Sequence, residues 1–88
     1  MKIKPGYLLR KVVEVYVIIG VGSDAYAPNQ IMSLNETGAL LWRCLETGVE
    51  KQELVDAILK EYDTDAGTAE KDVDAFLSQL REKALIDE

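Results

Sequence analysis

Acidic side chains are the residues that most readily suggest chemistry here, since 16 of the 88 residues are Asp or Glu. Five of them accompany apolar residues at helical spacing in the second half of the chain: Glu50, Glu53, Asp56, Asp72 and Asp74. They fall opposite or beside the apolar positions, and such a charge run is typical of a solvated helix face. We therefore interpret them as surface residues and predict no acid–base catalysis.

The residue patterns that usually bind metals or phosphate, or that activate a nucleophile, are also missing from the sequence. The chain has no histidine and one cysteine, Cys44, so it offers neither a His-activated nucleophile nor a thiolate zinc site. Asp63 and Asp65 have the spacing of a calcium loop, but the other ligands of that pattern are missing. Gly20 and Gly22 belong to no phosphate-binding motif, because no third glycine stands at the required spacing. We expect a non-enzyme without metal or cofactor.

The composition is that of a small globular domain, with 48% hydrophobic and 30% charged residues. Residues 1–88 are expected to form one domain with a core shared by all its elements. Residues 1–48 carry a net charge of +1 (five basic and four acidic side chains), and residues 49–88 carry −7 (five basic and twelve acidic). The acidic half disfavours nucleic acid, which is bound largely through Lys and Arg, and suits a basic peptide or protein.

No membrane or export signal is visible in the sequence. The longest apolar run, residues 15–21, contains a glycine and is far shorter than the roughly 20 residues that cross a bilayer. The N-terminus lacks a basic segment leading into an apolar one, and a single cysteine gives no support for secretion. We therefore expect a cytoplasmic protein without membrane contact.

Three strands are predicted in the first half of the chain. Residues 7–12 and 14–19 are rich in Val, Ile and Tyr and meet near Val13-Glu14, which predicts a hairpin with an unassigned turn type. Both faces of the second run are apolar, so we expect at least partial cover on each: Val15, Val17 and Ile19 on one, Tyr16 and Ile18 with Glu14 on the other. After a Gly- and Pro-containing loop, residues 30–34 form the third strand.

Three helices follow the strands. Asn35 is the expected N-cap of the first helix, although Ser33 three residues before Glu36 offers a rival capping box. The helix ends at Gly48, and Gly38 inside it indicates close backbone packing. Trp42 and Cys44 are assigned to the buried face of this helix.

The other two helices have apolar stripes at helical spacing. The second covers residues 51–62, with a stripe of Leu54, Val55, Ile58, Leu59 and Tyr62. The third is capped by Asp65 or Thr68 and has a stripe of Ala69, Val73, Phe76, Leu77 and Leu80. Leu85 and Ile86 form an apolar tail that could return to the sheet.

The order of elements predicts the fold class. Three consecutive strands favour an antiparallel sheet, and helices must cover one of its faces. The second and third helices, joined by a short turn, are typical of a helix-turn-helix pair. We predict an α+β, winged-helix-like domain with a three-stranded antiparallel sheet followed by three helices.

An ordered set of short motifs resembles the PqqD family. The matching pieces run along nearly the whole chain: Pro5-Gly6-Tyr7, Ile31-Met32-Ser33-Leu34, Asn35-Glu36-Thr37-Gly38-Ala39 with Trp42, Glu53-Leu54-Val55, Glu61-Tyr62-Asp63, Asp72-Val73, Phe76-Leu77 and Leu85-Ile86. Two positions depart from the pattern. Ala84 stands where a glycine is expected to end the third helix, and Glu50 stands where a Ser or Thr usually caps the second.

The resemblance implies a non-catalytic recognition element for ribosomally synthesised and post-translationally modified peptides (RiPPs). Such a protein binds the leader segment of a precursor peptide and presents it to a separate modifying enzyme, often a radical S-adenosylmethionine (SAM) protein. In the family the leader adds as a strand to the third strand, beside the third helix. The peptide-binding residues carried over are Gln30, Ile31, Met32, Ser33 and Leu34 on the strand, and Val73, Phe76, Leu77 and Leu80 on the helix.

Two other functions are compatible with the sequence. The apolar character of both faces of residues 14–19 suggests a protein–protein adaptor or dimerisation domain without leader specificity, and the chain could be a monomer or a homodimer. A helix-turn-helix pair is also compatible with a winged-helix DNA-binding regulator. The third helix argues against this function, because residues 68–80 contain one lysine, Lys71, against Glu70, Asp72 and Asp74.

Overall fold

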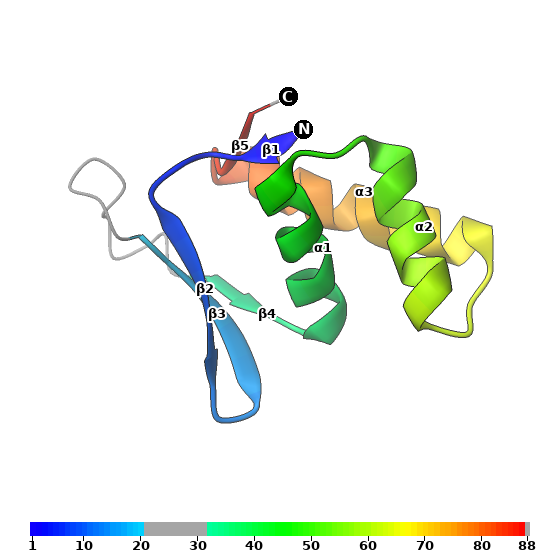
Figure 1. The fold of residues 1–88 in the computed structure, drawn as a ribbon, viewed down its shortest axis with the longest axis horizontal. Coiled ribbons are helices and arrows are strands. Elements are labelled where there is room, and N and C mark those ends of the chain that lie inside the picture. Colours follow the sequence, from blue (N-terminus) through cyan, green and yellow to red (C-terminus); the bar gives the residue numbers. More distant parts are fainter. Residues whose placement is uncertain (21–31, 88) are drawn as a thin grey trace.

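The computed structural model describes residues 1–20 and 32–87, and its elements follow the predicted order with two short strands added at the ends (Figure 1). The strands are β1 (Lys2–Ile3), β2 (Tyr7–Val12), β3 (Val15–Gly20), β4 (Met32–Leu34) and β5 (Ile86–Asp87). The helices are α1 (Glu36–Thr47), α2 (Lys51–Glu61) and α3 (Ala66–Glu82). An antiparallel sheet in the order β2-β3-β4 precedes the helices, which confirms the predicted α+β fold.

The hairpin between β2 and β3 has a two-residue turn. The strands pair from Tyr7 opposite Gly20 to Val12 opposite Val15, so Val13 and Glu14 form the turn and the predicted strand start at Glu14 was wrong by one residue. Val13 has a φ of 58°, in the left-handed region. Tight hairpin turns require such a conformation, which a β-branched residue adopts only at an energetic cost. The turn therefore contains backbone strain.

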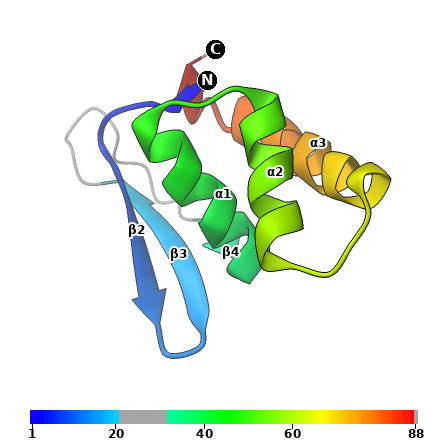
Figure 2. The same ribbon diagram turned by 45° about the vertical axis from the view of Figure 1, so that its right-hand side comes forward.

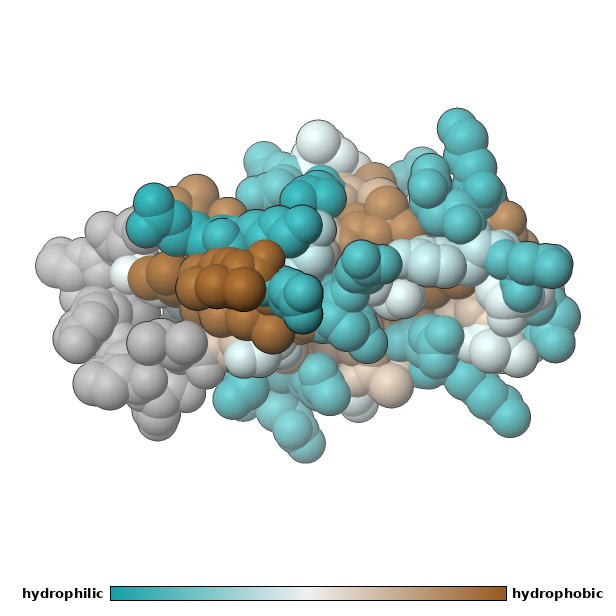
Figure 3. All heavy atoms as spheres, turned by 90° about the horizontal axis from the view of Figure 1, so that it is seen from below, coloured by the Kyte–Doolittle hydropathy of each residue, from teal (hydrophilic) through white to brown (hydrophobic). Residues whose placement is uncertain are grey.

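The two faces of this sheet differ in burial. Side chains on the inner face, from Leu9 of β2 to Leu34 of β4, pack against the helices, and Ile18 is completely buried. On the outer face Leu8, Val12 and Val15 remain 44–49% exposed, and Figure 3 shows apolar side chains gathered at the end of the hairpin. Cover is thus greater on the inner face, where Leu9 and Tyr16 are still only partly buried, than on the outer face.

The start of α1 has the local structure that the sequence predicts. The Asn35 side chain accepts a hydrogen bond from the backbone N–H of Gly38 at 2.8 Å. A Cβ atom at Gly38 would lie 3.3 Å from side-chain atoms of both Leu34 and Asn35, so the glycine permits close packing there. At the other end Gly48 has a φ of 83°, which suits a glycine after a helix.

The second and third helices begin with acidic caps. Glu53 accepts a hydrogen bond from the backbone N–H of Glu50 at 3.2 Å, so the first turn of α2 is capped even without a Ser or Thr. Asp65, rather than Thr68, caps α3 by accepting from the Thr68 backbone N–H at 2.7 Å.

The apolar stripe of α3 is buried as predicted, whereas that of α2 is narrower than predicted. All five residues of the α3 stripe have exposures of 7% or less. In α2, Leu54, Val55 and Ile58 are buried, but Leu59 and Tyr62 are each 37% exposed. Leu59 and Tyr62 therefore lie at the exposed margin of the predicted stripe, and Tyr62 follows Glu61, the last residue of α2.

The two ends of the chain meet beside α1 (Figure 2). Strand β5 pairs with β1, with Ile3 opposite Ile86, and forms a separate two-stranded sheet. The predicted return of residues 85–86 to the main sheet was therefore wrong. Val49 exchanges two backbone hydrogen bonds with Met1, at 2.9 and 3.0 Å, which ties this small sheet to the connection between α1 and α2.

One hydrophobic core joins the sheet and all three helices. Trp42 lies at its centre with no exposed surface, which confirms its assignment to the core, while Cys44 is only partly buried at the edge of the cluster. In the part of the chain that the structure describes, no helix is long and apolar enough to cross a membrane.

The end of α3 is a Schellman motif with alanine at the position that favours glycine. The backbone N–H of Leu85 donates to the carbonyl of Leu80, and that of Ala84 donates to Arg81. Ala84 consequently has a φ of 56°. A left-handed alanine costs about 1–2 kcal/mol, which explains why a glycine is expected here.

We predict that Ala84→Gly stabilises the protein by about 0.5–1 kcal/mol, because relief of the left-handed strain exceeds the added freedom of the unfolded chain. Ala75→Gly, the same change inside α3, should instead destabilise by about 1 kcal/mol. Urea unfolding followed by the fluorescence of Trp42 measures both. Equal losses of stability in the two variants would contradict the prediction.

Candidate peptide-binding site

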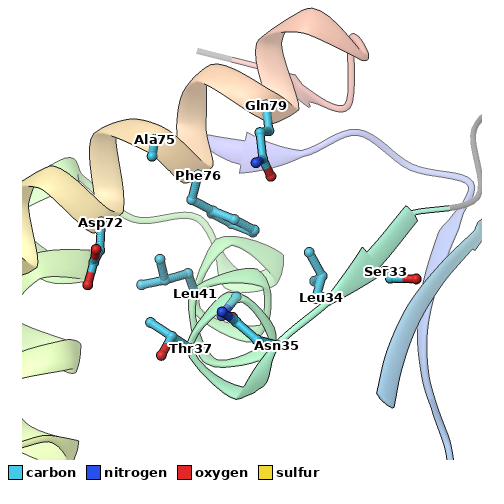
Figure 4. A pocket seen from close by; sticks show the side chains of 10 residues that line it. Ser33, Leu34, Asn35, Thr37, Leu41, Asp72, Ala75, Phe76 and Gln79 are labelled. Atoms are coloured by element: carbon cyan, nitrogen blue, oxygen red, sulfur yellow. The ribbon is translucent and has the colours of Figure 1, made fainter.

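A groove lies between α3 and the segment that joins β4 to α1 (Figure 4). Its cavity volume is about 340 Å³. Its walls come from two sides: Ser33, Leu34, Asn35, Thr37, Gly38 and Leu41 on β4 and α1, and Asp72, Ala75, Phe76 and Gln79 on α3. Elements from both halves of the sequence are therefore needed to form it.

The groove has an apolar centre and polar ends. Figure 4 shows the side chains of Leu34, Leu41 and Phe76 directed into its middle, with Asp72 near one end and Gln79 near the other. An apolar centre can take an apolar side chain out of water, while polar groups at the ends can fix its orientation. This arrangement suits an extended, amphipathic ligand better than a small polar one.

The free edge of β4 adjoins this groove. Residues 32–34 pair with β3 on one side, and no described residue pairs with them on the other. An unpaired strand edge leaves alternate N–H and C=O groups available to a further strand. Because Ser33 and Leu34 belong both to this edge and to the groove wall, a strand added to β4 would place side chains in the groove.

The predicted site residues divide into three groups. Ser33, Leu34 and Phe76 line the groove, whereas Gln30 and Ile31 lie outside the described residues. The remaining four are buried, with exposures of 7% or less: Met32, Val73, Leu77 and Leu80. None of these four is among the residues that line the groove, and the last three, which were predicted to form its wall, lie in the core, so their part in peptide binding stays a prediction.

Several groove residues were missed by the sequence reasoning. On α3 these are Asp72, Ala75 and Gln79, which stand at positions −4, −1 and +3 relative to Phe76. Residues three and four positions apart share a helix face. Asp72 and Gln79 could therefore have been predicted as groove residues from the position of Phe76. At the start of α1, Asn35 was predicted only as a helix cap, and Thr37 and Leu41 were assigned no binding role.

Charges on α3 are unequally neutralised. Lys51 of α2 lies 2.8 Å from Asp74 and 3.5 Å from Glu70, and its hydrogen bond with Asp74 raises the pKa of the lysine. At the start of the helix, the hydrogen bond from the Thr68 backbone N–H lowers the pKa of Asp65.

On α1, burial and the nearby Glu53 raise the pKa of Cys44, which keeps this thiol protonated and unreactive at neutral pH.

Comparison with known proteins identifies the family of this chain. Residues 16–86, from β3 to the start of β5, match the family described as coenzyme PQQ synthesis protein D (PqqD). The chain belongs to the PqqD family. The match includes β4, α1 and α3, which are the elements that form the groove.

Two solved structures of similar proteins extend the PqqD comparison. The structure of TbiB1 in complex with the TbiA(beta) leader peptide is 30% identical, with a TM-score of 0.77 over 99% of this chain and 95% of that chain. A lasso peptide synthetase B1 complexed with the leader peptide is 21% identical, with a TM-score of 0.73 over 96% and 93%, and supports the fold alone. A search of curated proteins gives no match.

The Asp65 cap predicts a pH-dependent stability. Its folded-state pKa is lowered, so the carboxylate stabilises the fold above the unfolded-state pKa of about 3.9, and this contribution is lost as the pH falls through the lower folded value. Asp65→Asn keeps a capping oxygen but does not titrate. We expect the urea midpoint of the natural protein to fall relative to that of Asp65→Asn between about pH 5 and pH 3. A pH-independent difference would contradict this.

Proposed function

We propose that this PqqD family member is a RiPP recognition element, which binds the leader segment of a ribosomally synthesised precursor peptide. The observation that carries the proposal is the open edge of β4 directly beside a groove with an apolar centre. It is supported by the likeness to TbiB1, a protein solved with a leader peptide bound. The leader would add to the sheet as a strand next to β4 and face α3.

The expected affinity follows from the size of this contact. Main-chain hydrogen bonds contribute about 0.5–1.5 kcal/mol net each, and a buried apolar side chain contributes about 1.5–3 kcal/mol. The described part of β4 has three residues, so few main-chain bonds are available there. After the cost of ordering the peptide, we expect a micromolar dissociation constant.

We further propose that the protein does not itself modify the peptide and presents it to a separate enzyme, such as a radical SAM protein. The sequence has no histidine, and the described residues contain no group of three side chains that could hold a metal ion. The hairpin end projects away from α3, so a second protein can approach while the groove is occupied (Figure 1). This activity belongs in the cytoplasm, where ribosomal precursors are made.

Backbone amide shifts test the proposed binding mode. Isotope-labelled protein is titrated with candidate leader peptides encoded by nearby short reading frames. We expect saturable shifts at residues 32–34 and 72–79, because these line the edge and the groove. A scrambled peptide should leave them unchanged. If every candidate leaves these amides unchanged in the folded protein, the proposal fails and an adaptor function is favoured.

Substitution of Phe76 tests the apolar centre of the groove. We expect Phe76→Leu to weaken leader binding about 3- to 10-fold by reducing the buried apolar contact, with a modest loss of stability. Val15→Thr on the exposed outer face of the sheet is the matched control and should not change the affinity. Isothermal titration calorimetry measures both. Equal effects of the two substitutions would argue against binding in the groove.

A further inference from the structure

Three acidic residues in the middle of α3 differ in their ionic partners. Glu70 and Asp74, one helical turn apart, both approach Lys51 of α2. Asp72 lies between them in sequence and therefore on the opposite side of the helix. Within residues 1–20 and 32–87, no cation lies within ion-pair distance of Asp72. The one lysine that α2 supplies to this region is thus turned away from Asp72.

Asp72 lies at one end of the groove, and Figure 4 shows Thr37 across from it on α1. Phe76 is one turn further along α3, at the apolar centre. A carboxylate without a cation beside the apolar centre of the groove favours a ligand that brings a positive charge and an apolar group together. The rest of the chain adds to this preference, because the protein has a net charge of −6.

The start of α1 does not reverse this preference. Helix N-termini carry partial positive charge, and residues from this end of α1 also line the groove. Here, however, the Asn35 side chain already occupies the N–H of Gly38, and Glu36 adds a negative charge in the first turn. Asp72 is the charged residue among those that line the groove.

The spacing along α3 matches the spacing along an extended peptide. Asp72 and Phe76 are four residues apart, which corresponds to a rise of about 6 Å along the helix. In a β-strand, side chains two residues apart lie on the same side and are separated by about 6.6 Å. A strand that lies along α3 with one side chain at Phe76 therefore brings the side chain two positions away to Asp72.

We propose that Asp72 is a specificity-determining residue that selects peptides with a Lys or Arg two residues from a large apolar side chain. This inference rests on the proposed function, since it requires a peptide strand between β4 and α3. The apolar side chain occupies the centre formed by Leu34, Leu41 and Phe76, and the basic group donates to the Asp72 carboxylate.

Selection from a displayed library of short random peptides tests the inference without knowledge of the natural leader. The natural protein, Asp72→Asn and Asp72→Lys serve as targets, and Asp74→Asn is the matched control on the other face of α3. We expect the natural protein and Asp74→Asn to enrich Lys or Arg two residues from an apolar residue. Asp72→Asn should lose this enrichment, and Asp72→Lys should replace it with Asp or Glu.

Affinities of one enriched peptide and its Lys→Gln or Arg→Gln counterpart give the size of the effect. We expect the ratio of the two dissociation constants to be about 3- to 10-fold for the natural protein, as for a partly exposed charge-assisted hydrogen bond. The ratio should decrease at high salt and approach one in Asp72→Asn. All target proteins are checked for native unfolding midpoints; Asp72 is exposed, and its side chain has no hydrogen bond or ion pair with another described residue.

The possible outcomes separate the inference from the function on which it rests. Enriched peptides that shift the amides of β4 and α3 but show no basic preference, or keep it in Asp72→Asn, would overturn the role of Asp72 and leave peptide binding intact. Selection that yields no peptide able to shift those amides would overturn both.

Discussion

The direct passage of β4 into α1 is the constraint on which the rest of the site depends. Only Asn35 separates the last strand residue, Leu34, from the first helical residue. The Asn35 cap and the missing side chain at Gly38 hold the start of the helix against Leu34. Because this junction fixes the strand edge relative to α1, it also fixes the distance from that edge to α3. A longer connection would remove this constraint and leave the pairing with β3 to hold the edge.

The sequence predicted best those structural features that depend on a single helix or strand. Caps at Asn35 and Asp65 and the stripe of α3 depend on residues within a few positions of one another, so local chemistry predicted them. The pairing of β1 with β5 joins two-residue strands from opposite ends of the chain, and strands so short have no detectable periodicity. The exposure of Leu59 and Tyr62 was not predicted, because helical spacing alone does not show how wide a face the neighbouring helices cover.

The candidate site was harder to predict than the fold, for a related reason. Helical spacing identifies an apolar face, but it does not show which residues on that face reach the surface. Val73, Leu77 and Leu80 point into the core, whereas Phe76 stands at its margin and meets Leu34 and Leu41 across the groove. Which residues of α3 reach the groove depends on where β4 lies, and β4 and α3 are far apart in the sequence. The family resemblance pointed to the two elements that border the groove but could not assign each side chain.

Helix α3 therefore contributes to both the core and the groove. A substitution in this helix affects stability together with binding at some positions and binding alone at others. The floor residue Phe76 is 7% exposed and also belongs to the hydrophobic core, so a change there alters stability together with binding. Asp72, Ala75 and Gln79 are exposed at the rim and do not belong to the hydrophobic core. Rim positions can vary in charge and size at little cost to folding, because exposed helical sites tolerate most residues. We therefore expect peptide specificity to reside at the rim of the groove, while the apolar floor supplies affinity common to many peptides.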